Sequence, residues 1–303
     1  MKHTAVAHGK IILTGEYAVV FGYPGIAVPA PLAMQATFEE NAASRDLTLK
    51  WLGISGGEIW EDYARKIILH LESVRSIVHS PFRGTLTIRN QLPLKKGMGS
   101  STALVIALTR CLLGQGKRTE ALAIEDAMNP GHSGIDFAVI WEEQPLYFRK
   151  GQEPQTITLP KDLLRGALLV DTGTPNESTP ELVAWIQERV FDPRIKQAMI
   201  QIGKCTERLR KGEDIRTVFR DHHRSQVALG VIPKPVQTLI AEIERLGGAA
   251  KVLGAGGKTG GGGLAHRSFG GGGTVLALHK NPDLILPVIR KNAHGFMPLL
   301  PSK

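Results

Sequence analysis

The chain has 303 residues and a hydrophobic content of 42%, which is enough for the core of one large domain or two. Its formal charge of +9 favours anionic partners such as nucleotides or phosphorylated metabolites. Aromatic residues make up only 6%, and no basic run is interleaved with them, so we do not expect a nucleic-acid partner. No stretch is apolar over the length of a membrane span, so we expect no membrane segment.

The cysteines and the N-terminus predict the compartment. Cys111 and Cys205 have no paired-motif spacing, which indicates free thiols in a reducing environment. The apolar run at residues 11–13 is flanked by Lys10 and Glu16, unlike the uncharged core of a signal peptide. We therefore expect a soluble, cytoplasmic protein. The sequence does not specify its oligomeric state, and a homodimer is one expectation.

The N-terminal segment predicts a β-rich layer broken by turns. Lys10 and Glu16 stand there in otherwise apolar runs, where an unpaired charge would be costly to bury. They pair with each other, face a ligand, or are solvated at strand ends. The expected strands are residues 4–7, 10–13, 18–21 and 26–28.

The spacing of apolar residues from 58 to 79 predicts an amphipathic helix that serves packing. After a β-like run at residues 85–88 comes a glycine loop, PLKKGMGSSTA, spanning residues 93–103. The apolar segment that follows, residues 103–113, suits a buried helix. The loop therefore joins a strand to the start of a helix.

The glycine loop has the features of an anion site. Gly97 and Gly99 carry no Cβ, so the backbone can turn sharply and bring its N–H groups against a ligand. Ser100 or Ser101 can cap the first helical turn. N–H groups at a helix start bind phosphate, and two lysines in the loop add positive charge. From the loop alone, a phosphate site and an ordinary strand-to-helix turn are equally supported.

Two carboxylates follow the loop. Glu125 lies in a predicted helix over residues 119–128, and Asp136 stands between small residues and an apolar run. Magnesium-dependent phosphoryl transfer needs one carboxylate to hold the metal and one to orient or deprotonate the acceptor hydroxyl. Taken singly, Glu125 could equally belong to a solvated face and Asp136 could be a helix cap.

A change in composition near residues 151–160 predicts a boundary between domains 1–155 and 156–303. Two glycine clusters near the end, in KVLGAGGKTGGGGLAHRSFGGGGTVLAL, favour a loop that closes over a ligand rather than a linker. Val252 stands where a P-loop requires glycine, which excludes that motif. The histidines show no metal-ligand spacing. The second half predicts strands at 166–171, 251–253 and 274–278 and helices at 181–189, 193–210, 215–229 and 235–246.

Three segments, GKIILTGEYAVVFG, PLKKGMGSSTA and KVLGAGGKTGGGG, resemble the three ordered motifs of the GHMP kinases. The resemblance spans nearly the whole chain. Two further segments, NPGHSGIDFAV and DTGTPNESTPELV, are similar to those of the mevalonate kinases within this family. The resemblance implies a two-domain α/β (α+β) fold with the active site between the domains. The N-terminal, ATP-binding domain would contain an unusual left-handed β-α-β connection, and the C-terminal domain would be ferredoxin-like.

The resemblance also implies roles for individual residues. Asp136 would be the catalytic base, and Lys10 would stabilise the reacting hydroxyl and the phosphates. Ser101 and Glu125 would hold magnesium. The residues that would bind the ATP phosphates are Lys95, Lys96, Gly97, Met98, Gly99, Ser100, Ser101 and Thr102.

Glu16, Tyr17 and Thr179 would lie at the acceptor. Two features depart from the family pattern. Tyr17 stands where many mevalonate kinases carry histidine, and the third motif is stretched over residues 254–273.

The resemblance implies an enzyme that uses ATP and Mg²⁺ to phosphorylate the primary hydroxyl of mevalonate or a related hydroxy acid, in isoprenoid biosynthesis. Alternatives are a GHMP kinase acting on phosphomevalonate or on the 3-hydroxyl of mevalonate, and a non-catalytic nucleotide-binding relative. The joint presence of Lys10, Glu125 and Asp136 disfavours the last, because a protein that only binds needs no base.

Overall fold

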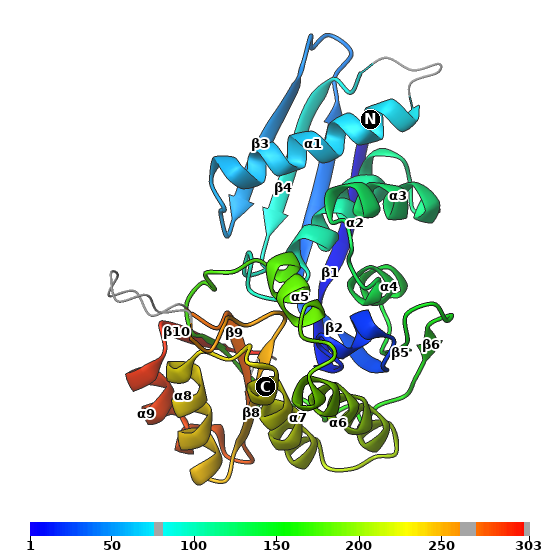
Figure 1. The fold of residues 1–303 in the computed structure, drawn as a ribbon. Helices are drawn as coiled ribbons and strands as arrows, with labels where there is room; N and C mark the ends of the chain where they lie inside the picture. The colour runs from blue at the N-terminus through cyan, green and yellow to red at the C-terminus, as the bar shows by residue number, and fades with distance from the viewer. Residues whose placement is uncertain (76–80, 261–270, 300–303) are drawn as a thin grey trace. The chain divides into compact units, whose positions relative to one another are not determined.

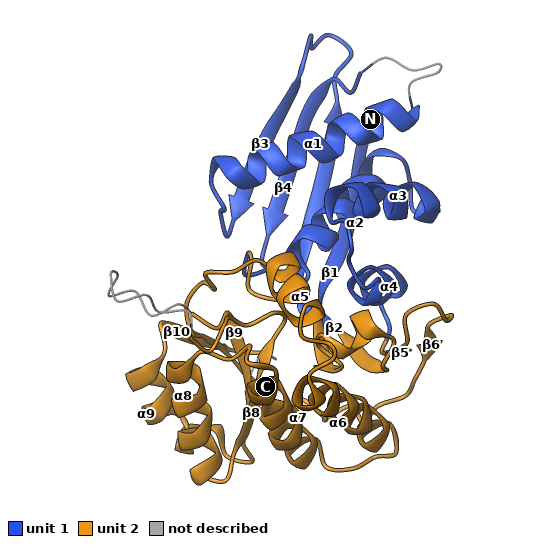
Figure 2. Ribbon diagram, in the orientation of Figure 1, with its two compact units in different colours: residues 1–10, 29–94, 98–144 blue, residues 11–28, 95–97, 145–303 orange. Residues whose placement is uncertain are grey.

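The computed structural model describes residues 1–75, 81–260 and 271–299 of the chain (Figure 1). The chain forms two compact units that are interleaved along the sequence (Figure 2). The predicted domains are continuous instead, and their boundary at residues 155 and 156 stays a prediction. Unit 1 comprises residues 1–10, 29–94 and 98–144, and unit 2 comprises residues 11–28, 95–97 and 145–303.

A six-stranded sheet has the order β3-β4-β2-β5-β6, and β1 pairs with β2. Burial alternates along β4, where Leu86 and Ile88 are buried and the threonine before each of them is half-buried. In unit 1, β2 is antiparallel to β4, and β3 is parallel to β4. The strands are β1 (Lys2–Thr14), β2 (Gly25–Glu40), β3 (Leu47–Gly53), β4 (Gly84–Asn90), β5 (Leu146–Phe148) and β6 (Gln155–Thr156).

Helix α1 connects the parallel strands β3 and β4, which gives the β-α-β unit that the resemblance implies. The left-handed sense of this connection stays a prediction. The predicted helix over residues 58–79 is confirmed as far as Arg75, and residues 76–80 lie outside the described residues. Helix α2 contacts α1, α3 and α4 and is buried along most of its length, which explains its apolar sequence. These helices are α1 (Glu58–Arg75), α2 (Ser100–Leu112), α3 (Arg118–Met128) and α4 (Ile135–Glu142).

Unit 2 contains an antiparallel sheet with the order β10-β7-β9-β8. With helices between β7 and β8 and between β9 and β10, this is the predicted ferredoxin-like arrangement. The first and last residues of α6, α7 and β9 are those that the sequence predicted. The elements are β7 (Leu168–Asp171), α5 (Thr179–Gln187), α6 (Pro193–Arg210), α7 (Ile215–Leu229), α8 (Lys234–Arg245), β8 (Ala249–Leu253), β9 (Thr274–Leu278), η2 (Pro282–Leu284), α9 (Leu286–Asn292) and β10 (Gly295–Pro298).

The strand predicted at residues 18–21 is wrong, because this segment is a 3₁₀ helix, η1 (Ala18–Phe21). Gly15 (φ 111°) and Tyr17 (φ 65°) both have positive φ and turn the chain out of the extended conformation of β1. The Val19 N–H then bonds to the Gly15 carbonyl at 3.0 Å. Ala18 and Val19 are buried, so the apolar run serves packing rather than a strand ladder.

The helices within the described ranges include none long and apolar enough to cross a membrane.

Candidate active site

Lys10, in the second half of β1, forms an ion pair with Asp136 in the first turn of α4. The Lys10 Nζ lies 3.1 Å from the Asp136 Oδ1. Lys10 is only 3% exposed, whereas the side chain of Asp136 is 32% exposed. A buried ammonium needs such a partner, and the exposed part of the carboxylate remains accessible to a substrate. The structure thus brings together the two predicted catalytic residues within unit 1.

Asp136 is positioned by the start of α4. Gly134 occupies the N-cap with φ 89°, a left-handed conformation that suits glycine. Asp136 lies inside the first turn, so it does not cap the helix. A carboxylate there is favoured by the positive end of the helix dipole.

The glycine loop lies directly beside Lys10, because the Lys10 backbone N–H donates to the Met98 carbonyl at 3.0 Å. The expectation that Ser100 or Ser101 caps α2 is wrong. Gly99, with φ 71°, is the N-cap, and among the described residues no side chain forms a capping hydrogen bond at this end of α2. Both serines lie inside the helix instead. The first turn of α2 therefore keeps N–H groups for an anion such as phosphate.

Positions 97 and 99 of the loop require glycine, because other atoms of the chain lie too close to leave room for a side chain. A Cβ on Gly99 would lie 2.9 Å from the Lys10 Cγ, within unit 1. A Cβ on Gly97 would lie 2.5 Å from the Leu253 carbonyl oxygen, within unit 2. Both glycines also have positive φ. The loop can follow this path only because neither residue has a side chain.

The two loop lysines differ in their surroundings. Lys95 is exposed and has φ 57°, while Lys96 forms an ion pair with Asp171 at the end of β7, within unit 2. Burial alone would raise the pKa of Asp171, but hydrogen bonds from Lys96 and the Gly173 N–H lower it. The sequence did not predict Asp171 as a partner. The nucleotide-binding role of both lysines stays a prediction.

Glu125, on α3, is buried, so it does not belong to a solvated face. Its Oε1 accepts a hydrogen bond from the Thr102 hydroxyl at 2.8 Å, and its Oε2 has no hydrogen-bond partner among the described side chains and backbone. Burial and the nearby Asp136 carboxylate raise its pKa, although the Thr102 bond opposes them. A buried carboxylate with an unsatisfied oxygen fits a cation.

The donor set at this place also suits Mg²⁺, which prefers oxygen ligands. Ser101 and Thr102 lie in the first turn of α2, and Thr102 ties that turn to Glu125. In the part of the chain that the structure describes, no group of three or more His, Cys, Asp or Glu side chains could hold a metal. A magnesium ion here would therefore complete its shell with nucleotide phosphates and water.

Glu16 lies in a buried charged cluster in unit 2. Its Oε1 pairs with Lys251 of β8, and its Oε2 lies 3.2 Å from the His222 Nε2 of α7. The Lys251 Nζ also donates to the Ile12 carbonyl at 3.0 Å. Burial would raise the pKa of Glu16, but Lys251 and His222 lower it to about 2. Lys10 and Glu16 therefore have different partners and do not pair with each other.

The other two predicted acceptor residues also lie in unit 2. Tyr17 is buried, and its hydroxyl donates to the Ala255 carbonyl, just after β8. Thr179 is exposed as the first residue of α5. Ser178 caps that helix, with Glu181 completing a capping box. The roles of Glu16, Tyr17 and Thr179 at the acceptor stay predictions.

Sequence reasoning missed Lys251 and His222. Lys251 had a usable signal, because it is a lone charge in an apolar strand, as Lys10 is. His222 gave no such signal, since a histidine on a helix is as often exposed as buried.

The buried histidines of α7 predict a loss of stability in acid. Burial lowers the pKa of His223 to about 4 and also lowers the pKa of His222. Below pH 6.5 these histidines therefore bind protons in the unfolded chain but not in the folded chain. Their contribution to the free energy of unfolding is fully present above pH 6.5 and is lost as the pH falls toward 4. We expect the free energy of unfolding in urea to fall by about 3 kcal/mol through His223 alone.

The same titration in the variant His223→Gln should show a smaller loss over this window. His3→Gln, at an exposed histidine, is the control and should leave the slope unchanged. Equal slopes for the wild type and His223→Gln would contradict the assignment.

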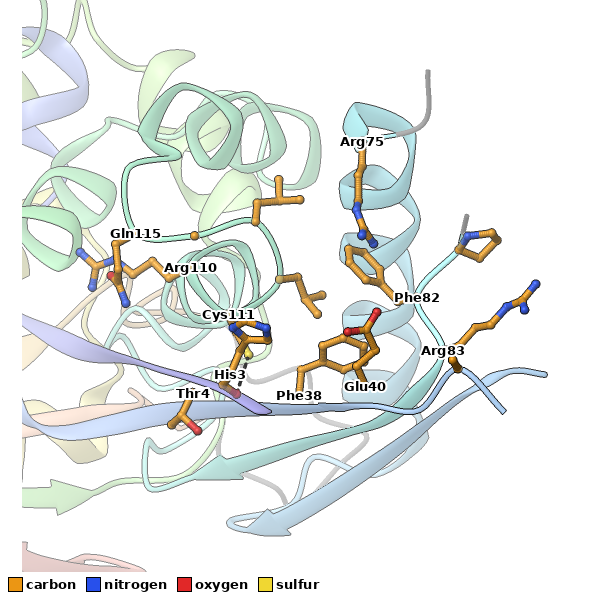
Figure 3. A pocket seen from close by; sticks show the side chains of 15 residues that line it. His3, Thr4, Phe38, Glu40, Arg75, Phe82, Arg83, Arg110, Cys111 and Gln115 are labelled. Atoms are coloured by element: carbon orange, nitrogen blue, oxygen red, sulfur yellow. Dashed lines mark hydrogen bonds between the residues drawn. The ribbon is translucent and has the colours of Figure 1, made fainter. Parts of the chain in front are cut away.

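A separate cavity of about 470 Å³ lies in unit 1 (Figure 3). It includes His3 at the start of β1 together with Phe38, Phe82 and Cys111, whose thiol donates to the His3 carbonyl. Lys10 lies about 23 Å further along the strand. None of the predicted site residues lines this cavity, so it is not the site formed around Lys10 and Asp136.

Known proteins resemble this chain over one segment or over most of its length. Residues 62–138 match the family described as GHMP kinases N terminal domain, a segment that holds the glycine loop, Glu125 and Asp136. The mevalonate kinase of Thermococcus sibiricus is 28% identical over 297 residues, covering 85% of this chain and 87% of that protein.

Solved structures match the fold of the chain. The L. major mevalonate kinase in complex with R-mevalonate matches with a TM-score of 0.78 at 19% identity, covering 97% of this chain and 94% of that one. The mevalonate kinase of methicillin-resistant Staphylococcus aureus matches with a TM-score of 0.69 at 25% identity, covering 98% and 99%. The predicted resemblance is thereby confirmed: residues 62–138 match the GHMP kinase N-terminal domain family, and most of the chain is similar to mevalonate kinases.

Proposed function

We propose that this protein is a mevalonate kinase that transfers the γ-phosphoryl group of ATP to the primary hydroxyl of mevalonate, giving 5-phosphomevalonate and ADP. The observation that carries the proposal is the Lys10 and Asp136 pair, 3.1 Å apart and next to the glycine loop. The mevalonate kinase relatives over most of the chain support the choice of acceptor.

Asp136 and Lys10 divide the chemistry. An alcohol is a poor nucleophile at neutral pH, so Asp136 takes the hydroxyl proton as the new oxygen–phosphorus bond forms. Lys10 is held by the Asp136 carboxylate and is nearly excluded from water. Its ammonium group stabilises the negative charge on the transferring phosphoryl group, and this effect is stronger where water is excluded.

The glycine loop and the start of α2 would hold the ATP phosphates, with N–H groups and the helix dipole directed at them. Ser101 and Glu125 would hold Mg²⁺, which when bound neutralises phosphate charge during transfer. The unsatisfied Oε2 of buried Glu125 is the observation that supports this assignment.

For the acceptor, we infer different roles for the three predicted residues. Thr179 is exposed and would contact the acceptor directly. Glu16 and Tyr17 are engaged with other groups of unit 2, so they would shape the acceptor's surroundings. A cytoplasmic location and a homodimer also belong to this proposal. The buried, free thiols of Cys111 and Cys205 accord with a reducing compartment.

A coupled assay of ADP release tests the function. Mevalonate, 5-phosphomevalonate, galactose and homoserine are supplied separately with MgATP, and ³¹P NMR locates the phosphate in the product. We expect ADP only with mevalonate, and the phosphate on its primary hydroxyl. Phosphate on the 3-hydroxyl or turnover of 5-phosphomevalonate would assign another GHMP kinase activity. Nucleotide binding without turnover of any acceptor would indicate a non-catalytic relative.

A further inference from the structure

Arg110, in the last turn of α2, bonds to β1 and to the end of α4 with one guanidinium group. Its Nη1 donates to the Val6 carbonyl of β1 at 3.2 Å and pairs with the Glu143 carboxylate directly after α4. Its Nη2 donates to the Trp141 carbonyl of α4 at 2.7 Å. The Arg110 side chain is only 9% exposed, and all four residues belong to unit 1. One side chain thus connects β1, α2 and α4.

On the strand side, Arg110 provides one of two attachments between β1 and the segment that contains α2. The Lys10 N–H donates to the Met98 carbonyl, just before α2, and the Val6 carbonyl accepts from Arg110, near the end of α2. Residues four apart in a strand direct their backbone groups to the same side, so both bonds hold the same edge of β1. Arg110 therefore fixes how the stretch of β1 that leads to Lys10 lies along α2.

On the helix side, Arg110 stabilises the end of a short helix. α4 has 8 residues, and a helix of this length depends on tertiary contacts for its place. A cation that bonds to the Trp141 carbonyl satisfies a C-terminal backbone group and interacts favourably with the helix dipole. The Arg110 guanidinium also lies 4.7 Å from the centroid of the Trp141 ring, which stacks on Phe137 with centroids 5.8 Å apart. Because Phe137 directly follows Asp136, this contact extends to the turn that carries the carboxylate.

Glu143 shows that the attachment is specific. It is the C-cap of α4 with φ 54°, a left-handed conformation that usually belongs to glycine. A residue with a side chain costs about 1–2 kcal/mol in this conformation. The ion pair with Arg110 offsets this cost, since strained backbone persists where surrounding contacts hold it.

We propose that Arg110 is a positioning residue that holds β1 and α4 against α2, so that Lys10 and Asp136 lie at the spacing that phosphoryl transfer requires. The proposal rests on the proposed function for the reaction itself. The two side chains are 3.1 Å apart, and a displacement of about 1 Å, even one caused far from the chemistry, can cost roughly 100-fold in rate. Arg110 lies outside the three motifs that resemble those of the GHMP kinases.

The variant Arg110→Ala tests the proposal through the division of its effect between kcat and KM. We expect kcat with MgATP and mevalonate to fall about 10- to 100-fold. KM for both substrates should change little, because Arg110 is not among the residues proposed to bind them. If Arg110→Ala fails to fold, Arg110→Lys is the second test. It keeps the charge, but one ammonium cannot replace the planar fork that bonds to two elements, so kcat should fall here as well.

Chemical rescue distinguishes a missing guanidinium from general damage to the fold. Arg110 also lines the cavity of about 470 Å³, so a small cation has access to its place (Figure 3). Millimolar guanidinium chloride should restore part of the kcat of Arg110→Ala, whereas KCl at equal ionic strength should not. The matched control is Arg208→Ala, which removes an arginine paired with Glu213 and Asp221 in the last turn of α6, in unit 2. Its kcat should be unchanged and indifferent to guanidinium.

Two further measurements link Arg110 to the catalytic pair. In an Asp136→Asn background, Arg110→Ala should add little further loss of kcat, because the position of an absent base no longer matters. A crystal structure of Arg110→Ala should show the Lys10 Nζ and the Asp136 Oδ1 more than about 4 Å apart, the limit of an ion pair. Unchanged kcat in both Arg110 variants would overturn the proposal, as would a lower kcat with the pair still in place.

The outcome is separable from that of the proposed function. If the protein releases no ADP with mevalonate, the choice of acceptor is rejected, and a displaced pair in the crystal structure of Arg110→Ala still upholds the role of Arg110. Turnover of mevalonate that is indifferent to Arg110 would uphold the proposed function and reject the positioning role.

Discussion

Replacing Asp136 with asparagine is expected to lower turnover by roughly 10²- to 10⁴-fold, the usual contribution of a general base. The amide keeps the shape of the side chain but cannot take the hydroxyl proton. Nucleotide affinity should change little, because the phosphates would bind to the glycine loop. Steady-state kinetics with mevalonate and equilibrium binding of ATP measure the two effects separately.

Lys10→Met extends this test. It removes the ammonium that lies 3.1 Å from Asp136, and it should also slow turnover. Because both groups act on one transition state, the double variant should lose much less than the product of the two separate losses. A folded Asp136→Asn enzyme with near-normal turnover would show that another group is the base. Strictly multiplicative losses would show that the two residues act independently.

Lys251→Met is expected to destabilise the fold by about 3–5 kcal/mol, the cost of leaving a buried charge without its partner. Lys251 is fully buried, and the Glu16 side chain is 2% exposed, so water cannot replace the lost ion pair. Urea unfolding at pH 7.5 measures the loss. Protonation of His222 beside Glu16 would offset part of it, which places the effect toward the lower end of this range.

The double variant Glu16→Gln/Lys251→Met distinguishes a lost ion pair from lost packing. Removing both charges should restore a large part of the stability, because no uncompensated charge remains. Lys2→Met is the control, since Lys2 and Glu39 form an exposed pair whose loss should change stability very little. If the double variant were no more stable than Lys251→Met, the pairing of Glu16 with Lys251 would not account for the effect.

Local patterns were read correctly wherever neighbouring residues decide the structure. The helical spacing predicted α6 and α7 to the residue, and the glycines and serines predicted a loop followed by a helix. Hydrophobic periodicity and turn chemistry act over a few residues, so they can be seen without the fold. The strand predicted from the local pattern at residues 18–21 was wrong. There the positive φ of Tyr17 turns the chain, and the apolar run forms the 3₁₀ helix η1.

The sequence by itself also determined the residue types needed for phosphoryl transfer, and the family resemblance assigned Lys10 and Asp136 their roles. Only the tertiary structure decided which charges pair. Lys10 meets Asp136 rather than Glu16, and Glu16 meets Lys251 from the far end of the chain. The physical reason is that burial makes an unpaired charge costly, but the partner that relieves this cost is chosen by how distant strands and helices pack. Packing likewise brought Tyr63 to Asn129, a contact that no local pattern in α1 could indicate.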